Sequence, residues 1–192
     1  MKYIYILVLA TAFFSCKNTS EKEEVLEINS ELKNEINIVV PDTIDDGMML
    51  LGVINRDGFK NDFFSEWYKE NYKEHALDTT IIEVLTTKLN EVSIKVFMGT
   101  WCSDSQKEVP ALYKILDAAK YDYSKLTIVA VSHDKDTPEH LEKGMDIQYV
   151  PTIILYKEGK EIGRFVEFAQ ENLEKDMLAI INEVGYKNSY EE

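Results

Sequence analysis

The sequence predicts an α/β domain in which helices flank a central mixed β-sheet. In the second half of the chain, short runs of β-branched and apolar residues alternate with segments whose apolar residues recur every three or four positions. This alternation indicates strands separated by amphipathic helices. A glycine-containing segment, Lys157–Lys160, directly joins two of the strand-like runs and is typical of a hairpin turn. A β-α-β unit followed by a hairpin predicts both parallel and antiparallel strand pairs.

Length and composition limit the possible functions. The chain has 192 residues, which suits one domain with additional segments rather than two full domains. Its hydrophobic content of 45% is enough for a packed core. The formal net charge of −14 argues against a nucleic-acid partner, because binding a polyanion requires a basic surface.

The N-terminus resembles a secretion signal. Lys2 precedes an apolar run, Tyr3–Phe14, which is too short to span a bilayer comfortably and is typical of a signal peptide over residues 1–15. Cys16 follows the run and resembles the lipid acceptor of a bacterial lipoprotein. Phe13 replaces the leucine usual in that motif, a relaxation similar to Bacteroidetes lipoprotein signals. We therefore expect a lipid-anchored protein of the cell envelope, facing the periplasm or on the outer membrane; the alternative is an uncleaved N-terminal anchor.

This interpretation determines which cysteine thiols stay unmodified and can react. If Cys16 becomes the lipidated first residue, the mature chain has 192 − 15 = 177 residues. Because the sequence contains two cysteines, Cys102 is then the one unmodified thiol. An internal disulfide is therefore excluded in the mature protein, whatever its fold.

Two segments separate Cys16 from the main domain. Residues 16–45 are largely polar and are interpreted as a solvated tether. Residues 46–92 are expected to form an N-terminal helical extension that begins with a strand-like run, Met48–Ile54, and ends with a helix at Ile81–Leu89. Between these lies an amphipathic helix with an aromatic stripe, which indicates a packing face more often than a ligand site. The stripe consists of Phe59, Phe63, Phe64, Trp67, Tyr68 and Tyr72.

Residues 93–187 carry the alternation of strands and helices and are expected to form the domain proper. The polar segment in their middle is interpreted as a connector with one short helix. The predicted elements are a strand at Ile94–Met98, a helix at Val109–Ala119, a strand at Leu126–Val131, the short helix at Pro138–Glu142, strands at Ile153–Tyr156 and Glu161–Val166, and a helix at Asn172–Val184.

Three markers in this domain occur in an informative order. Trp101-Cys102 follows the first strand-like run, Pro110 lies within the next helix, and Pro151 stands just before a later strand. This order resembles the thioredoxin superfamily, in which a reactive cysteine at a strand-to-helix turn faces a cis-proline. The resemblance covers roughly residues 93–184 and implies a thioredoxin-like fold.

The resemblance also implies roles for the residues around the cysteine. Cys102 would lie at a helix N-terminus, where unpaired backbone N–H groups and the helix dipole favour the reactive thiolate. Trp101 would cover one side of the site, and Pro151 would stand opposite the thiol. Val150 and Thr152 would present the adjoining backbone to an extended peptide substrate.

Departures from the family pattern limit the reactions that Cys102 could carry out. Ser105 occupies the position of the second cysteine, so a complete dithiol cycle within the chain is excluded. Val96 occupies the position where thioredoxins often hold a buried acid, and Asp104 opposes the thiolate by like charge. One remaining function is monothiol exchange or isomerase-like chemistry on extracytoplasmic protein thiols or disulfides. The alternative is a redox-inactive binding or chaperone-like module that uses the groove beside Pro151 and the aromatic helix.

Other candidate residues carry weaker signals. His75, His133 and His140 are too scattered in the sequence for metal-ligand spacing, so neither a metal nor a cofactor is expected. His133 follows a strand and is interpreted as a solvated loop residue, with a general-base role toward Cys102 as the alternative. Glu167 would either sharpen an acidic rim near the thiol or face outward.

Overall fold

The computed structural model describes residues 35–191, and the chain from Ile36 onward forms one compact unit. The predicted signal peptide, Cys16 and the tether as far as residue 34 lie outside the described residues. Among residues 35–191, no helix is both long enough and apolar enough to cross a membrane.

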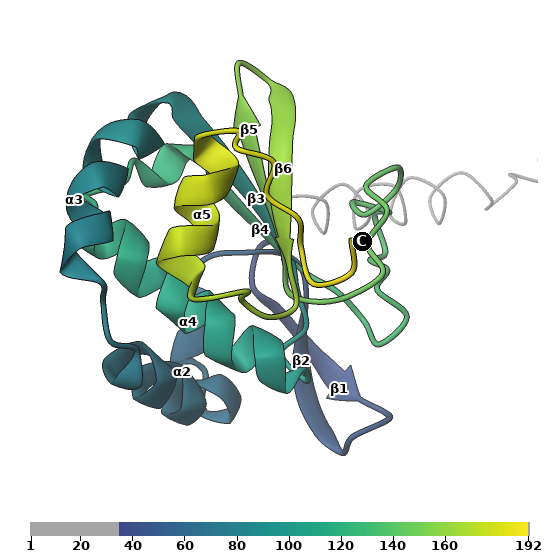
Figure 1. The fold of residues 1–192 in the computed structure, drawn as a ribbon. Coiled ribbons are helices and arrows are strands. Elements are labelled where there is room, and N and C mark those ends of the chain that lie inside the picture. The colour runs from purple at the N-terminus through teal and green to yellow at the C-terminus, as the bar shows by residue number, and fades with distance from the viewer. Residues whose placement is uncertain (1–34, 192) are drawn as a thin grey trace, which may run out of the picture. The chain divides into compact units, whose positions relative to one another are not determined.

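The core of the fold is a mixed sheet of six strands in the order β1-β2-β4-β3-β5-β6. Strands β3 and β4 are parallel, whereas all other neighbouring pairs are antiparallel. The predicted mixed sheet is thus confirmed (Figure 1). The strands are β1 (Ile38–Asp42), β2 (Gly47–Ile54), β3 (Val92–Met98), β4 (Leu126–Ala130), β5 (Thr152–Lys157) and β6 (Lys160–Val166).

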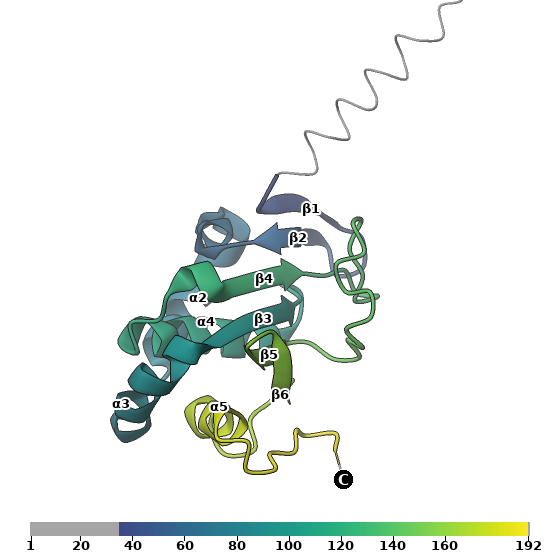
Figure 2. The same ribbon diagram turned by 90° about the horizontal axis from the view of Figure 1, so that it is seen from above.

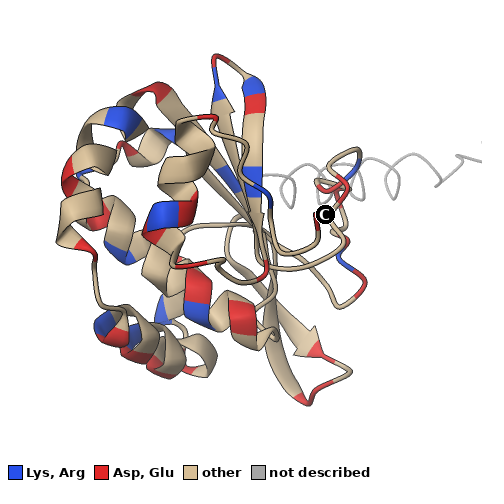
Figure 3. Ribbon diagram, in the orientation of Figure 1, with Lys and Arg blue, Asp and Glu red and all other residues tan. Residues whose placement is uncertain are grey.

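Helices cover one side of this sheet, and the connector between β4 and β5 lies on the other (Figure 1). Figure 2 shows the same division from above, with β1 and β6 at opposite edges. Acidic and basic positions are interspersed along the helices, while the β1–β2 turn carries acidic ones (Figure 3). The helices are α2 (Asp62–Glu74), α3 (Thr79–Lys88), α4 (Ser103–Ala118) and α5 (Leu173–Ile181), with 3-10 turns η1 (Arg56–Lys60), η2 (Leu89–Glu91) and η3 (Tyr123–Lys125).

Each face of the sheet has its own hydrophobic core. Successive strand residues point to opposite faces, and in β3 the fully buried Val96 belongs to the larger core while its neighbour Phe97 belongs to the smaller one. Leu141, Met145 and Ile147 of the connector pack against this smaller core. The connector therefore shields an apolar sheet face without forming a helix.

The short helix predicted at Pro138–Glu142 is wrong, because this segment forms turns. The Thr137 hydroxyl accepts a hydrogen bond of 2.9 Å from the Leu141 N–H. His140 has a φ of 55°, in the left-handed region that interrupts a right-handed helix. Side-chain bonding to the backbone thus competes here with helix formation.

Strand β1 lies within residues 16–45, the range predicted to be a tether. It pairs with β2 from Ile38 opposite Leu51 to Asp42 opposite Gly47. The run is short and contains Pro41, which weakens its strand pattern; an edge strand such as β1 can tolerate a proline. Because β2 pairs in turn with β4, the predicted extension and the domain share one sheet.

Apart from the exposed Phe63, the aromatic stripe packs into the protein. Phe59 and Phe64 are buried in the main core, and the larger rings that follow them are partly buried against it. The interpretation as a packing face is therefore confirmed. The predicted helix start is wrong, because Phe59 lies in η1 and α2 begins only after Asn61, whose side chain accepts a hydrogen bond from the Phe63 N–H.

The predicted hairpin between β5 and β6 is confirmed. Glu158 and Gly159 form its turn with φ values of 51° and 79°. Two consecutive positive φ values are the signature of a type I′ turn, whose twist matches that of the flanking strands.

Two neighbouring phenylalanines provide a test of this packing. Phe64 is 2% exposed, whereas Phe63 is 60% exposed. We expect Phe64→Ala to lower the free energy of unfolding by about 3–5 kcal/mol, because it leaves a cavity in the core. Phe63→Ala, the matched control, should change it by no more than about 0.5 kcal/mol. Urea unfolding measures both, and equal losses would contradict the described orientation of α2.

Candidate functional site

Cys102 lies at the junction between β3 and α4. It is the N-cap residue of α4 and has an extended backbone conformation, with φ −89° and ψ 124°. Its N–H donates to the Gly99 carbonyl at 3.0 Å, and its carbonyl accepts from the Gln106 N–H at 2.9 Å. A partly exposed free thiol is therefore positioned at a helix N-terminus, as the sequence predicts.

The turn before β5 faces this thiol. The Val150–Pro151 peptide bond is cis, and the Cys102 thiol donates a hydrogen bond of 3.1 Å to the Val150 carbonyl. The buried Thr152 donates from its hydroxyl to the Tyr149 carbonyl at 2.7 Å. The structure thus brings the predicted residues 102, 150 and 151 together, while the Thr152 side chain stabilises the turn from inside.

Ser105 faces the backbone of the turn before the helix. It is fully buried, and its hydroxyl accepts a hydrogen bond of 3.2 Å from the Gly99 N–H. Among the hydrogen bonds of the described residues, none joins Ser105 to Cys102. Val96, at the position where a buried acid would lie, is part of the apolar core.

Trp101 forms one wall of the site. Its indole N–H donates to the Val131 carbonyl at 3.0 Å, and its ring lies over Gly99. A Cβ at that glycine would come within 2.4 Å of the indole, closer than any ordinary contact. The sequence Gly99-Thr100-Trp101 thus permits a tight approach that another residue at position 99 would prevent.

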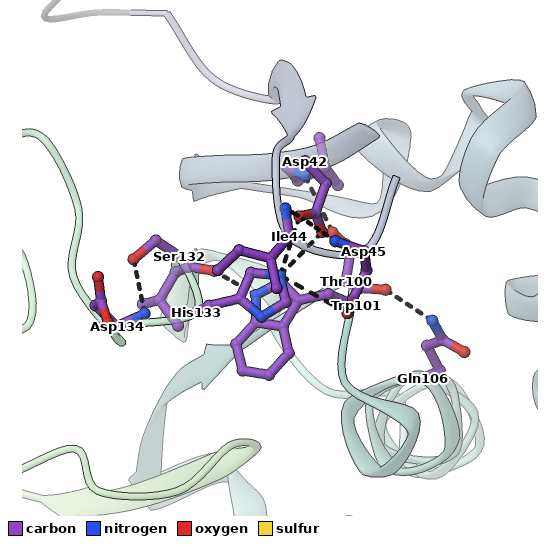
Figure 4. A network of polar contacts seen from close by, with 11 residues as sticks. Asp42, Ile44, Asp45, Thr100, Trp101, Gln106, Ser132, His133 and Asp134 are labelled. Atoms are coloured by element: carbon purple, nitrogen blue, oxygen red, sulfur yellow. Dashed lines mark hydrogen bonds and ion pairs between the residues drawn. The ribbon is translucent and has the colours of Figure 1, made fainter. Parts of the chain in front are cut away.

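His133 contacts the Trp101 ring. Its ring stacks on Trp101 with a centroid separation of 4.2 Å and an interplanar angle of 19°. Its Nε2 lies 3.1 and 3.0 Å from the two carboxylate oxygens of Asp42 (Figure 4). The interpretation of His133 as a solvated loop residue is therefore wrong. Among residues 35–191, no hydrogen bond joins His133 to Cys102, so its general-base role stays a prediction.

Asp42 is a site residue that the sequence analysis missed. The hydrogen bond from His133, followed by that from the Ile44 N–H, holds the pKa of Asp42 below its ordinary value. Asp42 and His133 are separated by 91 positions, so their pairing produces no local sequence pattern. The short apolar run of β1 was the one signal that could have placed Asp42 in the fold.

Asp42 and His133, together with Asp45, form a group whose geometry could suit a metal ion. One donor atom from each lies within 4.8 Å of the others, and no second group of this kind occurs among the described residues. The Asp42 carboxylate already accepts hydrogen bonds from the N–H groups of Ile44 and Asp45. The existing ion pair and turn therefore account for the arrangement without a metal.

Glu167 adds negative charge on the side of the Pro151 turn. Its N–H donates to the Pro151 carbonyl at 2.8 Å. Burial raises the pKa of Glu167, and repulsion from Asp104 raises it further, while Lys135 partly offsets both effects. Asp104 and Glu167 therefore form an acidic rim beside Cys102.

Three exposed aromatic side chains adjoin the same turn. Tyr149 and Tyr190 stack with a centroid separation of 3.8 Å, and Phe168 lies edge-on to Tyr190 at 6.3 Å. All three are exposed. We call Tyr149, Phe168 and Tyr190 the aromatic patch.

Comparisons with known proteins identify one matching family and several similar structures. The family model described as Thioredoxin matches residues 70–179, more than half of the chain, and its match begins within α2. A protein of unknown function from Pseudomonas aeruginosa is 18% identical, with a TM-score of 0.41 over 63% of this chain and 72% of that one.

Two thioredoxin structures are also similar. Mitochondrial thioredoxin 3 from Saccharomyces cerevisiae is 25% identical, with a TM-score of 0.29 over 49% of this chain and 84% of that one. The oxidised thioredoxin from Plasmodium falciparum is 17% identical, with a TM-score of 0.33 over 56% of this chain and 92% of that one.

The acidic rim makes a prediction about charge. Asp104→Asn should lower the pKa of Glu167, because the mutation removes a repulsive negative charge. Lys135→Gln should raise it. A carboxyl NMR titration measures both shifts, with Asp57→Asn in η1 as a control that should leave Glu167 unchanged. An unchanged Glu167 titration in Asp104→Asn would contradict the described rim.

Proposed function

Because the chain belongs to the thioredoxin family, we propose that Cys102 carries out monothiol thiol–disulfide exchange or isomerisation on extracytoplasmic proteins. The observation that supports this best is the position of the thiol. It lies at the N-terminus of α4 and faces the Val150–Pro151 turn, with 3.1 Å between Sγ and the Val150 oxygen.

The first step requires the thiolate, which is the nucleophile in disulfide exchange. Cys102 releases its proton to solvent and gives up its hydrogen bond to the Val150 carbonyl. Unpaired N–H groups at a helix N-terminus stabilise the resulting negative charge, while the acidic rim opposes it.

The exchange then proceeds without an external oxidant. The thiolate attacks one sulfur of a substrate disulfide, whose S–S bond breaks as the Cys102–substrate bond forms. The second substrate sulfur leaves as a thiolate. Another thiolate of the same substrate attacks the mixed disulfide, forms a new substrate disulfide and releases Cys102 unchanged.

Ser105 explains why the substrate must supply the resolving thiol. Its hydroxyl cannot form an S–S bond, and it is turned toward the Gly99 N–H. Cys102 is the one free cysteine among the described residues. An isomerisation, in which the substrate is neither oxidised nor reduced overall, fits this arrangement.

Loss of the thiol should abolish the activity. We expect Cys102→Ser to reduce the rate at which a protein with scrambled disulfides regains its native pairing to the uncatalysed rate. Cys16→Ser in the full chain is the matched control and should keep the wild-type rate. Refolding at wild-type speed with Cys102→Ser would refute the exchange function.

The aromatic patch favours a second function, a redox-inactive binding or chaperone-like module. Its three exposed rings lie beside the Pro151 turn, whereas Phe59 and Phe64 of the aromatic stripe are buried. The use of the aromatic helix to hold a partner stays a prediction, with Phe63 as its exposed ring. If binding is non-covalent, Cys102→Ala and wild type should capture the same partner from membranes with thiols blocked.

We also propose that Cys16 anchors the protein to an envelope membrane after removal of residues 1–15. The apolar run followed by Ser15-Cys16 supports this proposal. We expect the wild-type protein to partition into the detergent phase, and Cys16→Ser to move to the aqueous phase because it cannot accept a lipid. Aqueous partitioning of wild type would contradict the lipid anchor.

A further inference from the structure

We propose that Asp42 and His133 are positioning residues for the Cys102 thiol, because together they hold the Trp101 indole in place beside it. The relevance of this inference to disulfide exchange rests on the proposed function, whereas the positioning itself does not. Strand β1 thereby contributes to the site, although it precedes residues 70–179, which the family model matches.

Three of the neighbours of the Trp101 indole bear on its orientation. Gly99 lies beneath it without a Cβ, and the Val131 carbonyl accepts its N–H at 3.0 Å. His133 stacks on its ring at 4.2 Å. Gly99 and Val131 act through the backbone, whereas His133 acts through its side chain. A mutation of His133 therefore removes its contact without changing the backbone at Trp101.

The His133 ring is itself held in place by β1. Its Nε2 lies 3.0 and 3.1 Å from the two oxygens of the buried Asp42 carboxylate. That carboxylate also accepts hydrogen bonds from the Ile44 N–H at 3.0 Å and the Asp45 N–H at 3.2 Å. Figure 4 shows this series of contacts from the β1–β2 turn to the indole.

The orientation of the indole affects the thiol because both belong to one tight turn. The Cys102 N–H donates to the Gly99 carbonyl at 3.0 Å and closes the turn around Trp101. Trp101 and Cys102 also pack against the same small core, which includes Val150. A displaced indole therefore changes both the wall beside the sulfur and the access of reagents to it.

Several charged groups surround the stacked His133 and Trp101 rings. Asp42 faces its Nε2 from β1, and Asp45 lies 3.8 Å from it in the β1–β2 turn. Asp134 is its neighbour in the connector, and Lys135 places its Nζ 5.6 Å from the Trp101 ring centroid. The carboxylates of Asp42 and Asp45 therefore both face the imidazole from the β1–β2 side.

The test uses the full chain carrying Cys16→Ser and Trp67→Phe. Because the sequence contains two cysteines and two tryptophans, Cys102 and Trp101 are then the one thiol and the one indole. The rate of alkylation by iodoacetamide reports access to the thiol and requires no disulfide exchange. The fluorescence of Trp101 reports the environment of the indole.

We expect His133→Ala to accelerate alkylation of Cys102 by about 2- to 10-fold, the range that corresponds to one aromatic pair, and to shift Trp101 emission to longer wavelength. His133→Phe should restore part of both signals because it supplies a ring. Asp42→Asn retains an acceptor for the β1–β2 turn and should give a smaller change in the same direction.

His75→Ala is the matched control. His75 pairs with the buried Glu174 at 3.0 Å and has a 19% exposed side chain, compared with 17% for His133. Its loss should lower stability without changing the alkylation rate. Equal acceleration in His75→Ala would overturn the proposal, because general destabilisation would then explain the effect.

Unchanged alkylation and emission in His133→Ala and Asp42→Asn would also overturn it. If His133→Ala does not fold, Asp42→Asn and His133→Phe provide the same test. The outcome is separate from the proposed function, because alkylation can respond to these mutations even if Cys102 exchanges no disulfide.

Discussion

Four residues, Gly99 to Cys102, connect β3 to α4. The geometry of the site depends on which groups form hydrogen bonds with their backbone. An unpaired buried N–H or carbonyl is costly. The Ser105 hydroxyl accepts from the Gly99 N–H, and the Gln106 amide donates to the Thr100 carbonyl at 2.7 Å. The Thr100 hydroxyl accepts from the Leu50 N–H of β2 at 3.1 Å. These bonds fix the backbone that presents Cys102.

The same bonds give Ser105 a role other than that of a missing cysteine. A hydroxyl is a stronger hydrogen-bond acceptor than a thiol, and at this buried position it satisfies a main-chain donor. The residue that prevents a dithiol cycle therefore also stabilises the turn that holds the remaining thiol. The proposed monothiol chemistry is compatible with this structural role of Ser105.

Much of this arrangement could be predicted from local sequence patterns. Periodicity located most helices and strands, and the order of Cys102, Pro110 and Pro151 indicated the fold and the residues that face each other across the site. The pairing of Asp42 with His133 could not be predicted, because it joins segments 91 positions apart and neither residue belongs to a periodic pattern. The prediction of a short helix at Pro138–Glu142 was wrong because hydrogen bonds from side chains to the backbone outweighed helix propensity.

The connector between β4 and β5 contacts both the smaller core and the site. A helix on this face of the sheet would present side chains at fixed spacing, whereas the observed turns place each side chain individually. Leu141 and its apolar neighbours shield the smaller core, while His133 and Lys135, close to the end of β4, reach Trp101. Lys135 also offsets part of the repulsion between Asp104 and Glu167. One irregular segment therefore covers an apolar sheet face and influences both the indole wall and the charge beside Cys102.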